Sequence, residues 1–139
     1  MRIAKALKLV ACLLVVGVGL TGCSSSKSYD ESMNLGGINM GEALAGLISH
    51  TQQVMANVTD LSSAERAKAD LHRINQDYDD LLFNVPKMSE DGQFALAMQA
   101  RQSLPQMQDV SARISQVPVL HDIIGVELDE ITAKLAQLQ

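Results

Sequence analysis

The chain has few of the residues that usually carry chemistry or covalent cross-links. Its 139 residues include two cysteines, three histidines, two tyrosines, two phenylalanines and no tryptophan. Both cysteines, Cys12 and Cys23, lie near the N-terminus, so the rest of the chain cannot form a disulfide and depends on packing for stability. Leu, Ile, Val, Ala and Met supply nearly all of its apolar side chains, which is typical of helix–helix cores.

Motifs for catalysis or cofactor binding are also missing. The sequence contains no G-x-S-x-G nucleophile motif, no P-loop, no Cys/His pairing and no C-x-x-C-H haem attachment site. The histidines, His50, His72 and His121, lie far apart, and no two have metal-ligand spacing such as i, i+4. The methionines are too dispersed for a copper(I) site and are better explained as core filling. We therefore expect a protein that is not an enzyme and holds no metal or cofactor.

The first 23 residues differ from the rest of the chain. Residues 1–8 carry three cations and no acid, and residues 9–20 are almost wholly apolar. A short basic head, a short apolar run and then small residues form a secretory signal pattern. The apolar run is shorter than the roughly 20 residues that a membrane-spanning helix needs. The pattern therefore predicts a cleaved signal peptide over residues 1–22.

The end of that segment, Leu20-Thr21-Gly22-Cys23, resembles the lipobox of bacterial lipoproteins. The resemblance implies cleavage before Cys23 and attachment of diacylglycerol, and of a further acyl chain such as palmitate, to that residue. Each buried methylene would stabilise the anchor by about 0.8 kcal/mol. Ser24, where an Asp would imply retention in the inner membrane, implies an outer-membrane protein facing the periplasm. The alternative is a secreted protein or signal anchor in which this cysteine is incidental.

Beyond the signal peptide the chain is acidic. Eight cations and sixteen acids follow residue 22, which gives a net charge of −8. Such a charge opposes binding to nucleic acid and to anionic lipid surfaces. Residues 23–38 are mainly small and polar and include a glycine pair, which predicts a lipidated cysteine followed by a flexible tether. Residues 39–139 are then expected to form one domain.

Four segments of that domain place apolar residues at alternating three- and four-residue spacing. They cover about 40–59, 62–85, 89–117 and 119–138. Ser62 and Glu65 have the spacing of a capping box for the second segment. Pro105 predicts a kink or a break in the third segment, because proline removes a backbone donor. Gly125 predicts a weak point in the fourth.

The segments predict an all-α fold, an up-down antiparallel bundle of four helices. A three-helix arrangement with a loose first helix is the alternative, because Gly41 and Gly46 weaken the first segment. We interpret the apolar stripes as intramolecular core, since stripes this short rarely form intermolecular coiled coils.

Acidic side chains are the only candidate site residues in this domain. Asp77, Asp79 and Asp80 form its densest charge cluster and could meet a basic patch on a partner. They lack the glycine-containing loop and the terminal glutamate of a calcium-binding loop. Glu127, Asp129 and Glu130 are expected on a solvated helix exterior.

We therefore predict a non-catalytic accessory or structural module that binds an envelope protein. The alternative is a carrier of a small apolar ligand or metal in a bundle core opened near Pro105 and Gly125.

Overall fold

The computed structural model describes residues 31–139. The predicted signal peptide, Cys23 and the first part of the predicted tether lie outside the described residues. Four long helices make up most of the described chain, which confirms the predicted all-α bundle. They are α3 (Met40–Ala56), α4 (Leu61–Asn84), α5 (Glu90–Ser115) and α7 (Val126–Gln137).

Shorter elements connect these helices. A hairpin of two-residue strands, β1 (Asn34–Leu35) and β2 (Ile38–Asn39), precedes α3. A 3₁₀ turn, η1 (Val85–Lys87), joins α4 to α5. The short α6 (Pro118–Leu120) and the π-helical turn η2 (His121–Gly125) lead from α5 into α7.

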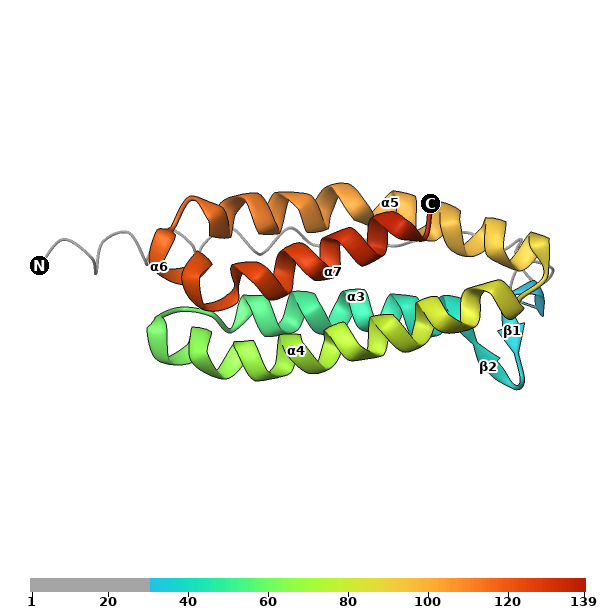
Figure 1. Cartoon of the computed structure of the whole chain (residues 1–139), viewed down its shortest axis with the longest axis horizontal. Helices are drawn as coiled ribbons and strands as arrows, with labels where there is room; N and C mark the ends of the chain where they lie inside the picture. The colour runs from blue at the N-terminus through green and yellow to red at the C-terminus, as the bar shows by residue number, and fades with distance from the viewer. Residues whose placement is uncertain (1–30) are drawn as a thin grey trace, which may run out of the picture.

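The long helices alternate in direction along the chain, as predicted (Figure 1). Around the bundle, however, α3 contacts α4, α4 contacts α7, α7 contacts α5, and α5 contacts α3. The consecutive helices α4 and α5 are therefore diagonal to each other, and η1 crosses the end of the bundle between them. As a result α7 separates α4 from α5 along the length that it covers.

Aliphatic side chains from all four helices fill the interior. The fourth predicted segment contributes every residue of its stripe, and the second contributes its whole stripe except Val85, which is half-buried and lies in η1. The first helix is a full member of the bundle, so the arrangement with a loose first helix is not the one observed. The buried residues of these three segments include Leu44, Ile48, Val54 and Met55; Ala67, Leu71, Ile74, Tyr78 and Leu81; and Leu120, Ile124, Leu128, Ile131, Leu135 and Leu138.

The N-terminus of α4 corrects one prediction. The capping residue is Asp60, whose Oδ1 accepts a hydrogen bond of 2.7 Å from the Ser63 backbone N–H. The Ser63 hydroxyl in turn accepts a bond of 2.9 Å from the Asp60 N–H. The capping box therefore lies two residues before the predicted Ser62–Glu65 pair. The Ser63 hydroxyl also donates to Asp60 Oδ1 at 2.8 Å. The bonds that the Ser63 backbone N–H and, second, the Ser63 hydroxyl donate to this carboxylate lower the pKa of Asp60 below its ordinary value.

Two further irregularities lie at Pro105 and Gly125. α5 does not break at Pro105, which lies on the exposed side of the helix, where water can hydrate the carbonyl that loses its backbone donor. Gly125 is buried and ends the π-helical turn η2, so the fourth predicted segment is irregular there. A Cβ atom there would lie 2.5–2.9 Å from ring atoms of His121, so this close approach requires glycine.

The hairpin occupies positions that the sequence places in the flexible tether. Gly36 and Gly37 have φ angles of +59° and +87°, which suit the two central residues of a tight hairpin turn. The backbone N–H of Met40 donates to Met33 O at 2.9 Å, and the Met33 thioether lies where a Cβ of Gly41 would be. The glycine pair thus makes a turn that holds residues 33–39 against the bundle.

Candidate functional site

The predicted acidic patch on α4 is exposed, but the structure does not leave all of it available. Asp79 Oδ1 lies 2.8 Å from Lys134 Nζ of α7, so this carboxylate is already paired within the chain. Asp77 and Asp80 are exposed and make no hydrogen bond or ion pair through their carboxylates with residues 31–139. The three aspartates are therefore not one uniform binding surface.

A polar cluster that the sequence analysis missed lies between α4 and α7. Asn75 is only 3% exposed, and its Nδ2 donates to Glu127 Oε2 at 2.8 Å and to Glu130 Oε2 at 3.1 Å. The prediction of a solvated exterior is wrong for Glu127, whose side chain is 14% exposed. It holds for Asp129 and Glu130, which are exposed. The sequence signal for this cluster was the position of Asn75, a polar residue directly after Ile74 of the predicted apolar stripe.

His72 and Lys134 extend this cluster to the surface. His72 Nδ1 lies 3.2 Å from Glu127 Oε1, and the two form an ion pair only when the imidazole is protonated. Because His72 is 63% exposed, the pair contributes little to stability. Lys134 Nζ donates to the backbone oxygen of Asn75 at 2.9 Å. These hydrogen bonds set the register of two parallel helices. Among residues 31–139, no group of three or more His, Cys, Asp or Glu side chains is arranged to hold a metal ion.

Tyr78 is the largest side chain buried in the centre of the bundle. It is fully buried, and its hydroxyl has no hydrogen-bond partner within residues 31–139. Burial raises the pKa of this hydroxyl well above its ordinary value, because the apolar surroundings disfavour the phenolate. Tyr78 therefore acts as a neutral core residue and cannot reach a ligand on the surface.

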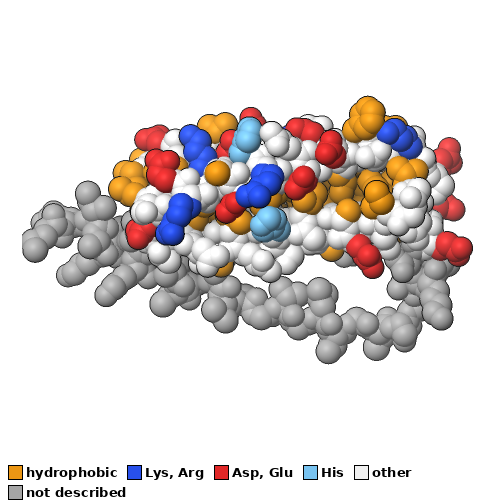
Figure 2. Space-filling model, turned by 90° about the horizontal axis from the view of Figure 1, so that it is seen from below, with side chains coloured by type: hydrophobic (Ala, Val, Ile, Leu, Met, Phe, Trp, Pro, Cys, Tyr) orange, Lys and Arg blue, Asp and Glu red, His pale blue; other side chains and the backbone are white. Residues whose placement is uncertain are grey.

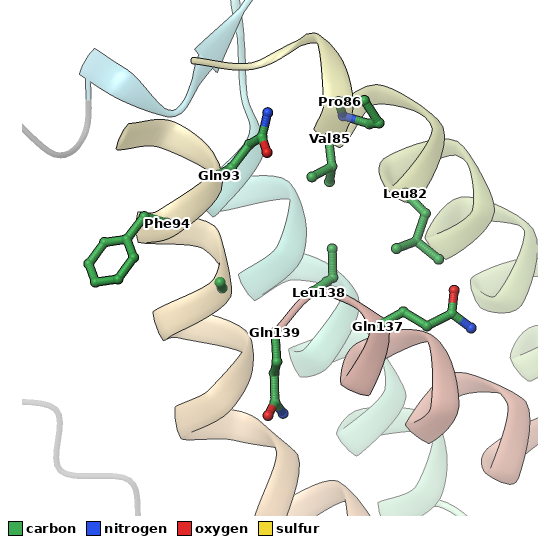
Figure 3. A pocket seen from close by; sticks show the side chains of 9 residues that line it. Leu82, Val85, Pro86, Gln93, Phe94, Gln137, Leu138 and Gln139 are labelled. Atoms are coloured by element: carbon green, nitrogen blue, oxygen red, sulfur yellow. The ribbon is translucent and has the colours of Figure 1, made fainter. Parts of the chain in front are cut away.

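An open groove lies at the end of the bundle that carries the hairpin. It has a volume of about 500 Å³ and receives residues from η1, from α4 and α5, and from the C-terminal end of α7. Figure 3 shows Leu82, Val85 and Leu138 converging on it, while the Phe94 ring stands at the rim and points outward. We call this feature the end groove; it is lined by Leu82, Val85, Pro86, Gln93, Phe94, Ala97, Gln137, Leu138 and Gln139.

The end groove follows directly from the topology. α7 separates α4 from α5, and the residues at its C-terminal end, Gln137 and Leu138, line the same groove as Leu82 and Ala97. α5 begins at Glu90, seven residues before Ala97, so about 10 Å of that helix has no α7 beside it. The groove is therefore the uncovered continuation of the space that α7 fills elsewhere.

Apolar side chains are also exposed at this end. Phe83 and Phe94 are 71% and 63% exposed, and Met98, one turn after Phe94, is 40% exposed. On the face shown in Figure 2, hydrophobic side chains gather toward the hairpin end, whereas acids are spread along the length of the bundle. Sequence periodicity cannot predict this patch, because it depends on where a neighbouring helix ends.

Comparison of the chain with protein-family models, curated proteins and solved structures finds no match. Within residues 31–139, no helix combines the length and the apolar character needed to cross a membrane.

Proposed function

We propose that the protein is a lipid-anchored module of the bacterial envelope that binds another envelope protein without catalysing a reaction. The basic head, the short apolar run and the lipobox-like Leu20–Cys23 support the anchor. Ser24 supports an outer-membrane location facing the periplasm. The anchor confines the search for a partner to the membrane surface.

One observation carries the binding function: the bundle has a filled core, but its hairpin end exposes an apolar groove and aromatic side chains. Leu128, Ile131 and Leu135 are at most 1% exposed, so this part of the core is closed to solvent. Phe83 and Phe94, in contrast, expose most of their surface to solvent. Exposed apolar surface of this kind marks interaction sites in soluble domains.

The anchor would bring this same end of the bundle close to the membrane. Ser32 contacts the first turn of α5, where its backbone oxygen lies 3.5 Å from Ser89 Oγ. Ser32 is nine positions after Cys23, so Ser32 can lie no more than about 30 Å from a lipidated Cys23. A partner at the membrane surface would therefore meet the groove before it met the opposite end.

A carrier of a small apolar ligand is the second candidate, and the volume of the end groove favours it. About 500 Å³ falls within the range of small-molecule sites. The groove is open, however, and three glutamines, Gln93, Gln137 and Gln139, contribute to its lining. The carrier function ranks second because an apolar cargo needs a more enclosed and more apolar site.

The anchor is tested by metabolic labelling of cells with an alkyne analogue of palmitate. We expect Cys23→Ser to abolish labelling and to leave an unprocessed precursor. Cys12→Ser, which changes the other cysteine, should label and process like the wild type. Ser24→Asp should move the labelled protein toward the inner membrane in fractionated envelopes. Normal labelling of Cys23→Ser would refute lipidation at this residue.

The binding function is tested by cross-linking the tagged full-length protein in cells and identifying what it captures by mass spectrometry. We expect one dominant envelope protein and a melting temperature that small molecules leave unchanged. A bound small molecule in native mass spectrometry, without a protein adduct, would support the carrier instead.

A further inference from the structure

The place of the end groove in the bundle defines the shape of what can fill it. α7 lies between the diagonal helices α4 and α5, so the groove beyond Leu138 continues the space that a helix occupies deeper in the bundle. Leu82 and Val85 lie on one wall and Ala97 on the other, with Leu138 at the closed end. A helix entering this gap would bury these side chains as α7 buries their counterparts deeper in the bundle.

The charge around the groove defines the chemistry of that helix. Asp79, Glu90 and Asp91 each lie three residues before a lining residue, namely Leu82, Gln93 and Phe94, and therefore on the same helical faces. Asp80 adds a fourth exposed acid to this end of α4. Asp79 is paired with Lys134, but Asp80, Glu90 and Asp91 form no ion pair within residues 31–139, and they favour a partner with basic residues at the edges of its apolar face.

Two cations near the groove make contacts within the chain. Lys134 pairs with Asp79 at 2.8 Å. Lys87 Nζ lies 3.9 Å from the centroid of the Phe83 ring and donates to Asn84 Oδ1 at 2.8 Å. Neither forms an ion pair with Glu90 or Asp91, which therefore remain without a basic partner among residues 31–139.

We propose that the end groove binds an amphipathic, basic α-helical segment of a partner protein, which takes the place that α7 leaves empty between α4 and α5. The inference rests on the proposed binding function and names the site and the chemistry of the partner. The bound segment needs about two turns of apolar contact, which matches the roughly 10 Å of α5 that α7 leaves uncovered. Lys or Arg residues beside those turns would face Glu90 and Asp91.

The test is photo-cross-linking of the full-length protein in cells, with benzoylphenylalanine in place of Phe94 at the groove rim. The same replacement of Phe83, an exposed phenylalanine that does not line the groove, is the matched control. Sequencing of the cross-linked peptide identifies the bound segment. We expect a Phe94 adduct with a segment that has helical apolar periodicity and Lys or Arg beside it, at several times the yield from Phe83.

Charge variants then test the groove itself. Gln137→Arg puts a cation on the exposed lining at the end of α7 and should reduce the Phe94 adduct at least tenfold. Gln116→Arg, the same change at the exposed C-terminal end of α5, should leave the adduct unchanged. Ala97→Arg, which fills the groove, should act like Gln137→Arg, with Ala112→Arg as its control. Circular dichroism of each variant confirms folding, and Gln137 is exposed enough for its variant to fold normally.

Several results would overturn the proposal. They are a Phe94 adduct with lipid, with a second copy of the chain or with a non-basic segment, no adduct at all, or a yield unaffected by Gln137→Arg. Failure of the proposed function gives a different pattern. A labelled, folded protein that cross-links to no protein from Phe83 or from Phe94 would refute binding as a whole. Protein adducts at Phe83 without one at Phe94 would refute only the groove.

Discussion

The two ends of the bundle are built differently. At the end where α3 passes into α4 and α5 into α7, the chain closes the core with Leu120 and Ile124, which are at most 1% exposed. At the hairpin end α7 stops before its neighbours, and Leu82 and Val85 are only half-buried. The closed end is therefore expected to determine stability, and the open end to determine recognition.

The largest effect is expected from a charge at the closed end. Leu120→Asp buries an unpaired carboxylate and should lower the free energy of unfolding by at least about 3 kcal/mol. Val119→Asp, one residue earlier and 48% exposed, should change it by less than about 1 kcal/mol. Urea denaturation followed by circular dichroism measures both. Equal losses would contradict the assignment of Leu120 to the core.

A smaller effect is expected at the π-helical turn of the same end. Gly125→Ala places a Cβ atom against the His121 ring and should cost about 1–3 kcal/mol through overpacking. The double variant Gly125→Ala/His121→Ala lacks the ring and should recover part of the lost stability. A double-mutant cycle measures the coupling, and a coupling energy near zero would show that the ring does not cause the cost.

At the open end, a smaller effect is expected in the hairpin turn. Gly37→Ala should lower the free energy of unfolding by about 1 kcal/mol, because φ at this position is +87°. Gly46→Ala is the control, and its expected change in the free energy of unfolding has the opposite sign. Gly46 is exposed in α3 with no atom near its Cβ position, so alanine should stabilise the helix by about 1 kcal/mol. Thermal melts of both variants test the pair, and destabilisation by Gly46→Ala would contradict it.

The smallest effect concerns the Asp60 cap. Asp60→Ala should lower the melting temperature at neutral pH, whereas Ser62→Ala should not, because the Ser62 side chain does not cap α4. The hydrogen bonds from Ser63 lower the pKa of Asp60, so the cap stabilises the fold fully above the ordinary value of 3.8. As pH falls below 3.8 the carboxylate is protonated and this stabilisation is lost. The difference between wild type and Asp60→Ala should therefore shrink there, and a constant difference would contradict the role of the charge.

The four helices and most of their buried residues were predictable from the sequence. Apolar residues at three- and four-residue spacing, such as those from Leu120 to Leu138, indicate which side of a helix is buried. This inference does not depend on which helices pack against it. The cap of α4 was predicted two residues too late, because Ser62–Glu65 and Asp60–Ser63 are both plausible capping pairs. Only the backbone geometry distinguishes them.

The sequence by itself determined that the protein is all-α, acidic and built on four amphipathic helices, because those properties arise from composition and from local periodicity. The tertiary structure alone decided that α4 and α5 are diagonal, that Asn75 meets Glu127 from 52 positions away, and that α7 ends beside Leu82. Each of these depends on contacts between distant segments, which a local pattern cannot encode. The end groove arises from the last of them, because its walls are exposed only where a third helix stops.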